Sequence, residues 1–151
     1  HETAAPLCRI KGLVPCVVED LREVHLGDWE GGLFRIMVHQ NHPKVIEMHE
    51  RQEWGIIPGA ESNAEFDARV ARGLNSIIEK HPDQVVAVVV HGGVIGSVLA
   101  QATKSEPFAF VGADNASISH LVAHQGRLSL RRFNDTSHLS TAISTETSLP
   151  T

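Results

Sequence analysis

The sequence predicts an α/β fold built from layers of helices and strands. An uninterrupted apolar run at residues 85–90 is typical of a strand buried on both faces, as in the middle of a parallel sheet. Residues 91–93, His-Gly-Gly, allow a tight turn, and the apolar segment 94–103 then predicts a helix. One face of an earlier helix is marked at helical spacing by Phe66, Val70, Leu74, Ile77 and Ile78. Helix, strand, turn and helix therefore alternate, which indicates a layered α/β architecture.

Two helical regions before residue 85 have recognisable limits. Ser62 and Glu65 form a capping box, because each side chain can accept a hydrogen bond from the other residue's N–H at the start of a helix. Pro82 is expected to end that helix. Residues 33–52 predict further helical structure, interrupted at the Asn-His-Pro string of residues 41–43. These signals define the helices more sharply than the strands.

The two ends of the chain supply smaller elements. Residues 1–7 are expected to be the last turns of a helix, and Gly12 is expected to close that unit. Short strands are predicted at residues 14–18, 115–123 and 127–133. Pro15 favours an edge or strand-start position for the first of them. A turn at residues 124–126 is expected to pair the last two near a sheet edge.

Length and composition limit the possible classes of protein. With 151 residues and 42% hydrophobic content, the chain can bury one core, so residues 1–138 are read as one domain. Residues 139–151 are rich in Ser and Thr, and we expect a disordered tail there. The net charge of −5, without a basic block, argues against nucleic acid and anionic membranes as partners. Cys8 and Cys16 fit reduced thiols, which favours a cytoplasmic protein.

His91 is the first candidate functional residue. It is expected at the carboxyl end of the strand of residues 85–90 and beside the N-terminus of the helix that follows. Ligands bind at this position in α/β folds, and free helix N–H groups attract anions. The alternative is a histidine that only closes a turn.

The loop of residues 21–31 is the second candidate region. It combines a histidine, a tryptophan, glycines and carboxylates that include Glu23 and Glu30. If Glu23 turns into a partly buried pocket, desolvation favours its neutral form, as a general acid requires. The alternative is a solvated acidic loop anchored by Trp29.

Four strings of the sequence, in order, resemble the histidine phosphatase superfamily, the phosphoglycerate-mutase-like enzymes. They are LREVHLGDWEG, IPGAES, VVAVVVHGGVIGSVLA and NASIS, and the similarity extends from residue 1 to about residue 138. The resemblance implies a three-layer sandwich in which helices flank a mostly parallel central sheet. It also implies that His91 is the second histidine of a phosphate pocket and Glu23 the proton donor to the leaving group. The motif positions of Gly92, Glu30, Glu61 and Ser62 imply that they border the phosphate or substrate site.

The chain departs from this family pattern at its N-terminal side. The family's nucleophile lies in an Arg-His-Gly motif at the end of the first strand, and no such string occurs in the 151 residues. The domain is therefore expected to lack its first strand, so that a complementing N-terminal segment or a second copy of the chain would complete it. The nucleophile is expected upstream of this chain.

The resemblance implies a phosphatase that hydrolyses small-molecule phosphate monoesters through a phosphohistidine, with no metal or cofactor. A phosphoglycerate-type mutase is an alternative, although mutases usually carry a longer insertion in the region of residues 33–57. A second alternative is a catalytically inactive phosphate-binding or interaction module. A third is a metal site formed by His39, His42 and His49, against which solvent-facing helix residues are the simpler interpretation.

Overall fold

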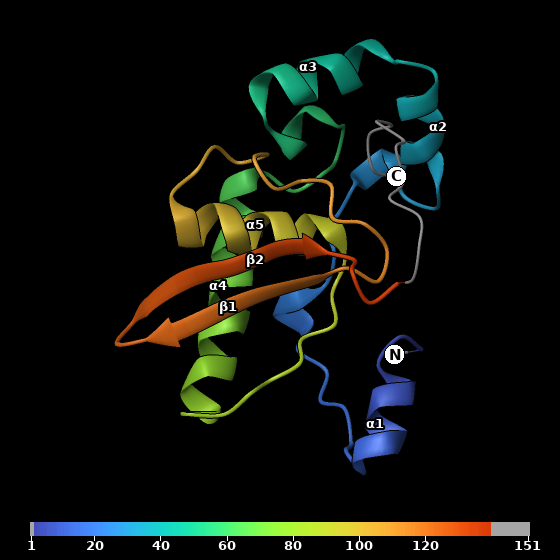
Figure 1. Ribbon diagram of the computed structural model, residues 1–151. Helices are drawn as coiled ribbons and strands as arrows, with labels where there is room; N and C mark the ends of the chain where they lie inside the picture. The colour runs from blue at the N-terminus through green and yellow to red at the C-terminus, as the bar shows by residue number, and fades with distance from the viewer. Residues whose placement is uncertain (1, 140–151) are drawn as a thin grey trace.

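The computed structural model describes residues 2–139, which form a mixed α/β arrangement (Figure 1). The helices and strands of this part are α1 (Ala5–Lys11), α2 (Leu33–His39), α3 (Pro43–Arg51), α4 (Asn63–Lys80), α5 (Gly92–Thr103), β1 (Ile118–His124) and β2 (Arg127–Asp135). Single 3-10 turns lie at Glu19–Leu21, Gly27–Trp29 and Trp54–Ile56. The predicted mixture of helices and strands is confirmed. Residues 140–151, most of the predicted tail, lie outside the described part.

The helix limits that the sequence predicts are largely confirmed. The capping box of α4 forms as expected: the Glu65 N–H donates to Ser62 Oγ (3.3 Å), and the Ser62 N–H donates to Glu65 Oε2 (2.9 Å). Pro82 follows the end of α4 by two residues. The expected interruption separates α2 from α3, because Asn41 adopts a positive φ of 50° and Pro43 starts the next helix.

The first helix lies later in the chain than the sequence predicts. We expected its last turns within residues 1–7, but α1 runs from Ala5 to Lys11. Gly12 closes it, as predicted, in the left-handed conformation at a φ of 64°. No residue of α1 is buried, and the helix lies at the edge of the molecule (Figure 1).

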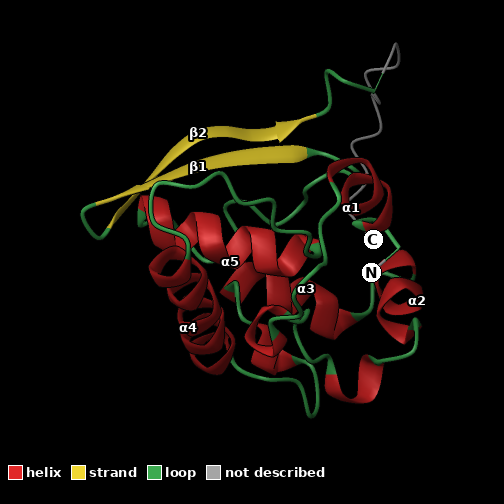
Figure 2. Cartoon of the chain, turned by 90° about the horizontal axis from the view of Figure 1, so that it is seen from below, coloured by secondary structure: helices red, strands yellow, loops and turns green. Residues whose placement is uncertain are grey.

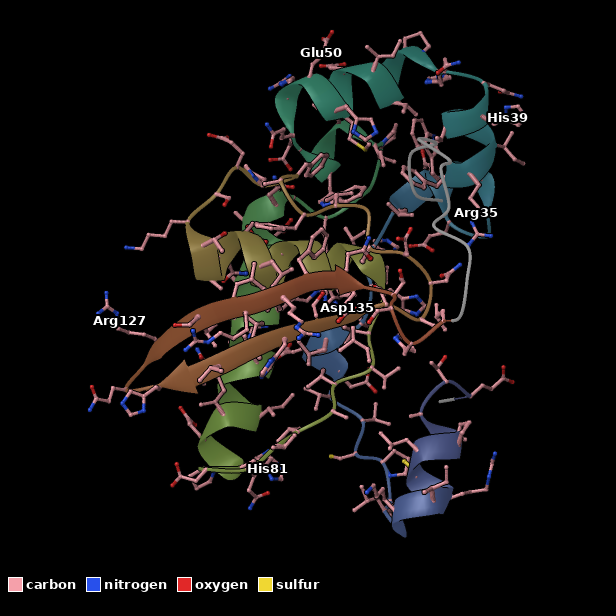
Figure 3. The ribbon with its side chains drawn as sticks, in the orientation of Figure 1. Arg35, His39, Glu50, His81, Arg127 and Asp135 are labelled. Atoms are coloured by element: carbon pink, nitrogen blue, oxygen red, sulfur yellow. The ribbon has the colours of Figure 1, made fainter. Side chains whose placement is uncertain are left out.

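The predicted hairpin near the C-terminal side is confirmed. β1 pairs with β2 in antiparallel register, from His124 opposite Arg127 to Ile118 opposite Asp135. Gln125 and Gly126 connect the strands with positive φ angles of 49° and 72°, which suits a tight two-residue turn. Figure 3 shows Arg127 at the free tip of this hairpin and Asp135 near its other end.

The mostly parallel central sheet is not formed by the described residues. Residues 85–90 and 14–18, both predicted to be strands, have no strand assignment, and the one sheet of residues 2–139 is the antiparallel hairpin. The backbone of residues 85–90 forms no hydrogen bond to another described backbone group. A strand exists only with a partner, so an apolar β-branched run remains irregular when nothing pairs with it. Val85 is in fact fully exposed.

Helix α5 lies in the middle of the described part. The hairpin covers one side of it through β2, and α4 packs on another side (Figure 2). Ser97 of α5 donates to Asp67 of α4 at 2.5 Å, which joins the two helices. The fully buried side chains Phe66, Val70 and Val94 lie in the core to which both helices contribute. Helix α4 also contacts the 3-10 turn Glu19–Leu21, so the loop that follows this turn lies beside both α4 and the start of α5.

None of the helices within residues 2–139 has the length and hydropathy of a membrane span.

Candidate active site

The site is built around the N-terminal end of α5. His91 is its N-cap residue, with an extended backbone (φ −89°, ψ 170°), and its side chain does not cap the helix. The His91 carbonyl accepts the first backbone hydrogen bond, from the Ile95 N–H at 3.1 Å. The first N–H groups of a helix have no partner within the helix and carry partial positive charge. The predicted placement of His91 at a helix N-terminus is thus found, although the strand before it is not.

Glu23 reaches this helix end from 70 residues away in the sequence. Its Oε2 atom accepts a hydrogen bond from the Gly93 N–H at 3.0 Å, and its Oε1 atom accepts one from the Val24 N–H at 2.8 Å. The carboxylate is half-buried and lies where the partial positive charge of α5 is concentrated. The structure therefore brings Glu23 to the first turn of α5, directly after His91.

The two glycines of the His-Gly-Gly string have different surroundings. A Cβ atom at Gly93 would collide with the Glu23 carboxylate, whereas a Cβ atom at Gly92 would meet no atom within 4 Å. The Glu23 carboxylate therefore occupies the space that a side chain at position 93 would fill. The residues alone predicted only a turn at both glycines, and the family resemblance named Gly92 and not Gly93 as a site residue, so the role of Gly93 was missed.

Glu30 and Ser62 form hydrogen bonds within their own loops. Glu30 Oε1 accepts from the Leu26 N–H at 2.7 Å and lies 3.1 Å from His25 Nδ1. Ser62 Oγ is engaged in the capping box of α4, where it also donates to Glu65 Oε2 at 2.7 Å. Within the described residues, neither side chain forms a hydrogen bond to Glu23 or to the start of α5.

Glu61 forms a buried ion pair. Its two carboxylate oxygens lie 2.9 Å from Nε and 2.6 Å from one terminal nitrogen of Arg69, and both side chains are largely buried. The His25 N–H donates to Glu61 Oε2 at 2.7 Å. Burial is the strongest single influence and raises the pKa of Glu61, but the hydrogen bonds from Arg69 and His25, together with the charge of Arg69, outweigh it and hold the pKa below its ordinary value.

Arg69 is a residue that the sequence analysis missed. It is only 4% exposed, and its guanidinium lies 4.7 Å from the centre of the Phe66 ring. Its neighbours on the same face of α4, Phe66, Val70 and Gly73, are buried as well. The available signal was an arginine within an apolar helix face, eight residues after the glutamate of the IPGAES string. A charged residue in such a place is normally paired.

The three histidines considered for a metal site are dispersed among other contacts. The His42 side chain accepts from the Lys44 N–H and packs edge-on to Trp29, with ring centres 5.4 Å apart. His49 packs against Phe108, and burial lowers its pKa. His39 points outward from α2 (Figure 3). In the part of the chain from residue 2 to 139, no three His, Cys, Asp or Glu side chains gather as a metal site.

Two solved structures have the same fold as this chain. YhfR from Bacillus stearothermophilus aligns with a TM-score of 0.75 at 22% identity, over 91% of this chain and 70% of that protein. Mycobacterial glucosyl-3-phosphoglycerate phosphatase in complex with inorganic phosphate aligns with a TM-score of 0.71 at 30% identity, over 92% of this chain and 73% of that protein.

Sequence comparison identifies curated relatives of the same kind. Glucosyl-3-phosphoglycerate phosphatase from Mycobacterium tuberculosis (strain ATCC 25618 / H37Rv) is 31% identical over 136 residues, which cover 82% of this chain. The aligned region is 60% of that relative's length, so this chain corresponds to only part of it. Phosphoglycerate mutase-like protein 4 from Arabidopsis thaliana is 35% identical over 92 residues, which cover 57% of this chain and 38% of that protein.

The family model of the histidine phosphatase superfamily (branch 1) matches residues 1–136. This match includes the loop of Glu23, the IPGAES string and the start of α5. It confirms the resemblance that the four sequence strings indicate. The chain belongs to the histidine phosphatase superfamily.

Proposed function

We propose that the intact protein is a phosphatase that hydrolyses small-molecule phosphate monoesters through a phosphohistidine intermediate. The observation that carries this proposal is the hydrogen bond between Glu23 and the Gly93 N–H, which joins an acid to the helix end that begins at His91. The similarity to a phosphatase whose solved structure holds inorganic phosphate supports it. The nucleophilic histidine is provided by a segment upstream of this chain.

The proposed roles follow from charge and proton balance. A neutral imidazole of the upstream nucleophile attacks phosphorus, and the bond to the leaving alkoxide breaks as the bond from nitrogen to phosphorus forms. His91 and those N–H groups at the start of α5 that Glu23 does not occupy stabilise the negative charge on the phosphoryl oxygens. Glu23, protonated, gives its proton to the alkoxide. Water then cleaves the phosphohistidine, and the Glu23 carboxylate takes the proton that this water loses.

The remaining candidate residues border the substrate. Gly92 has open space beside it, so a phosphoryl group can approach the backbone closely at that position. Glu30, Glu61 and Ser62 hold the surrounding loops through the hydrogen bonds described above. Their contribution to substrate binding is therefore proposed to be indirect.

We further propose that the central sheet forms when the domain is complete. Residues 14–18 and 85–90 are apolar, and their backbone groups are free of ladder hydrogen bonds within the described part. Exposed apolar side chains in these segments include Val14, Val17, Val85 and Val89. An additional strand, from the upstream segment or from a second copy of the chain, would pair their backbones and bury these side chains.

A phosphoglycerate-type mutase is the second candidate, since the chain is also similar to phosphoglycerate mutase-like protein 4. The short segment between the loop of Glu23 and the IPGAES string favours the phosphatase. A catalytically inactive binding module is the third candidate, because the 151 residues contain no Arg-His-Gly string.

The test is an assay of the intact protein, with its natural N-terminal segment, on p-nitrophenyl phosphate and alkyl phosphates. We expect hydrolysis without added metal or phosphoglycerate cofactor. His91→Ala should lower kcat by about 10²-fold on both kinds of ester, because it acts on the charge of the phosphoryl group, and Glu23→Gln should lower kcat by about 10²-fold on alkyl phosphates, whose leaving alkoxide needs a proton. An intact protein that leaves every monoester unchanged would favour the binding module, and transfer of the phosphoryl group to a phosphoglycerate in place of water would favour the mutase.

A further inference from the structure

We propose that Arg69 and Glu61 form a clamp that positions Glu23 for proton transfer. Within the described residues the clamp, defined as these two side chains, forms no hydrogen bond to the start of α5. It acts by holding the backbone on which Glu23 is carried. The inference rests on the proposed function, because it assigns Glu23 the role of proton donor.

The guanidinium of Arg69 uses all five of its N–H donors. One terminal nitrogen donates to the carbonyls of Asp20 (3.0 Å) and Arg22 (2.7 Å), and the other donates to the carbonyl of Glu23 (2.9 Å). The remaining N–H groups are engaged by the Glu61 carboxylate. Three carbonyls of one short loop therefore converge on a single buried side chain.

Because every N–H donor of Arg69 is already used, this arginine is not available to bind phosphate. An arginine in a phosphatase is expected to bind phosphate, and it needs free N–H donors and access to the substrate. Arg69 has no free donor and is 4% exposed. Its geometry is that of a group that holds protein backbone.

Glu61 completes the clamp from the other side. Its Oε2 accepts from the His25 N–H, and the Glu61 N–H donates in turn to the His25 carbonyl at 3.1 Å. The chain is therefore fixed at Arg22 and Glu23 through their carbonyls and at His25 through both of its backbone groups. The backbone of Glu23 is therefore held directly and on both sides, while its side chain extends to α5.

The backbone and the side chain of Glu23 are consequently bonded to two different helices. Its backbone is held by Arg69 of α4, and its carboxylate bonds to the Gly93 N–H of α5. A proton donor must lie at hydrogen-bond distance from the leaving oxygen, about 2.6–3.2 Å, and a displacement of about 1 Å from that position costs on the order of 10²-fold in rate. Lysine cannot replace the arginine, because an ammonium group has three donors on one atom and cannot span three carbonyls and a carboxylate.

The dependence of rate on the leaving group tests the clamp in the intact protein. p-Nitrophenolate leaves readily without a proton, whereas the alkoxide of glycerol phosphate needs one. Arg69→Lys and Glu61→Gln should therefore lower kcat/KM for glycerol phosphate by about 10²-fold and for p-nitrophenyl phosphate by less than about tenfold, because kcat/KM includes only the steps up to departure of the leaving group and not the later hydrolysis of the phosphohistidine. Equal losses on the two esters, or no loss on either, would overturn the proposal. Glu61→Gln is nearly isosteric, so it gives a second reading if Arg69→Lys fails to fold.

Arg72→Met is the matched control. Arg72 lies on the same helix and reaches the same loop, at 3.1 Å from the Asp20 carboxylate, but through an exposed ion pair. Its loss should leave both rates within about twofold of the wild type, because exposed pairs contribute little. A selective loss on glycerol phosphate in this variant as well would contradict a specific role for the clamp.

Hydrogen exchange of the Gly93 amide separates the clamp from the proposed function. If the wild-type protein hydrolyses neither ester, the proposed function fails, but this amide still reports whether Glu23 remains bonded to α5. Its exchange should be about tenfold faster in Arg69→Lys and Glu61→Gln and unchanged in Arg72→Met, because displacement of the Glu23 backbone weakens the hydrogen bond that protects this amide. Exchange at the wild-type rate in both clamp variants would overturn the inference independently of any activity.

Discussion

Gly93 illustrates how one residue joins two distant segments. Its N–H binds the Glu23 carboxylate, and its missing side chain leaves the space that this carboxylate occupies. The sequence string that contains it could be assigned to a turn before a helix. That Gly93, and not Gly92, faces the acid depends on how residues 19–26 pack on α5, which no local pattern encodes.

Gly93→Ala and Gly92→Ala form a matched pair of substitutions. The added methyl group at position 93 would push the Glu23 carboxylate away from the Gly93 N–H, so we expect the free energy of unfolding to fall by about 1 kcal/mol, the net contribution of one hydrogen bond. At position 92 the methyl group enters open space, and the change should stay within about 0.5 kcal/mol.

Chemical denaturation of the intact protein measures both variants. Equal destabilisation by the two substitutions would show that the close approach of Glu23 to Gly93 is not what distinguishes the glycines.

At the scale of elements, the sequence predicted the helices better than the strands. The capping box and the break at Asn41 are local signals, and the structure confirms both. The hairpin is also local, since its turn and both strands lie within 20 residues. Residues 85–90 have an equally clear strand composition, but their pairing depends on a distant segment. Local patterns therefore predicted the local elements and failed where a partner was required.

The ion pair between α4 and its neighbouring loop should make stability depend on pH. The pKa of Glu61 is lower in the folded protein than its ordinary value of 4.5. Ionised Glu61 therefore stabilises the fold above that pH, and this contribution is lost as the pH falls through the folded-state pKa. Glu61→Gln should lower the free energy of unfolding by about 2 kcal/mol at neutral pH. The difference between wild type and variant should shrink as the pH falls below 4.5.

Denaturation curves of the intact protein at a series of pH values check this prediction. Glu47→Gln is the control, because it removes only the exposed pair between Glu47 and Arg51 of α3 and should cost less than about 0.5 kcal/mol. A difference for Glu61→Gln that grows as the pH falls would contradict the assigned direction of the pKa.

At the scale of the whole molecule, the candidate site joins parts that the sequence could only place in order. The strings around Glu23 and His91 indicated the family and the two principal residues. The resemblance gave Glu23 and His91 roles in one reaction, and the hydrogen bond from Gly93 brings the Glu23 carboxylate to the helix that starts after His91. The sequence analysis did not identify Arg69, because its partners include three backbone carbonyls. Every residue has a backbone carbonyl, so such partners cannot be predicted from residue types.

The central claim is that His91 and the start of α5 form a phosphate site beside Glu23. The most direct measurement is a titration of the intact protein with inorganic phosphate, followed through the backbone amide signals of Gly92 and Gly93. We predict saturable shifts of both signals, and His91→Ala should weaken this binding by about tenfold or more, because a charge-assisted hydrogen bond to the anion is removed. Amide signals that do not respond to phosphate, or that respond equally in His91→Ala, would contradict the claim.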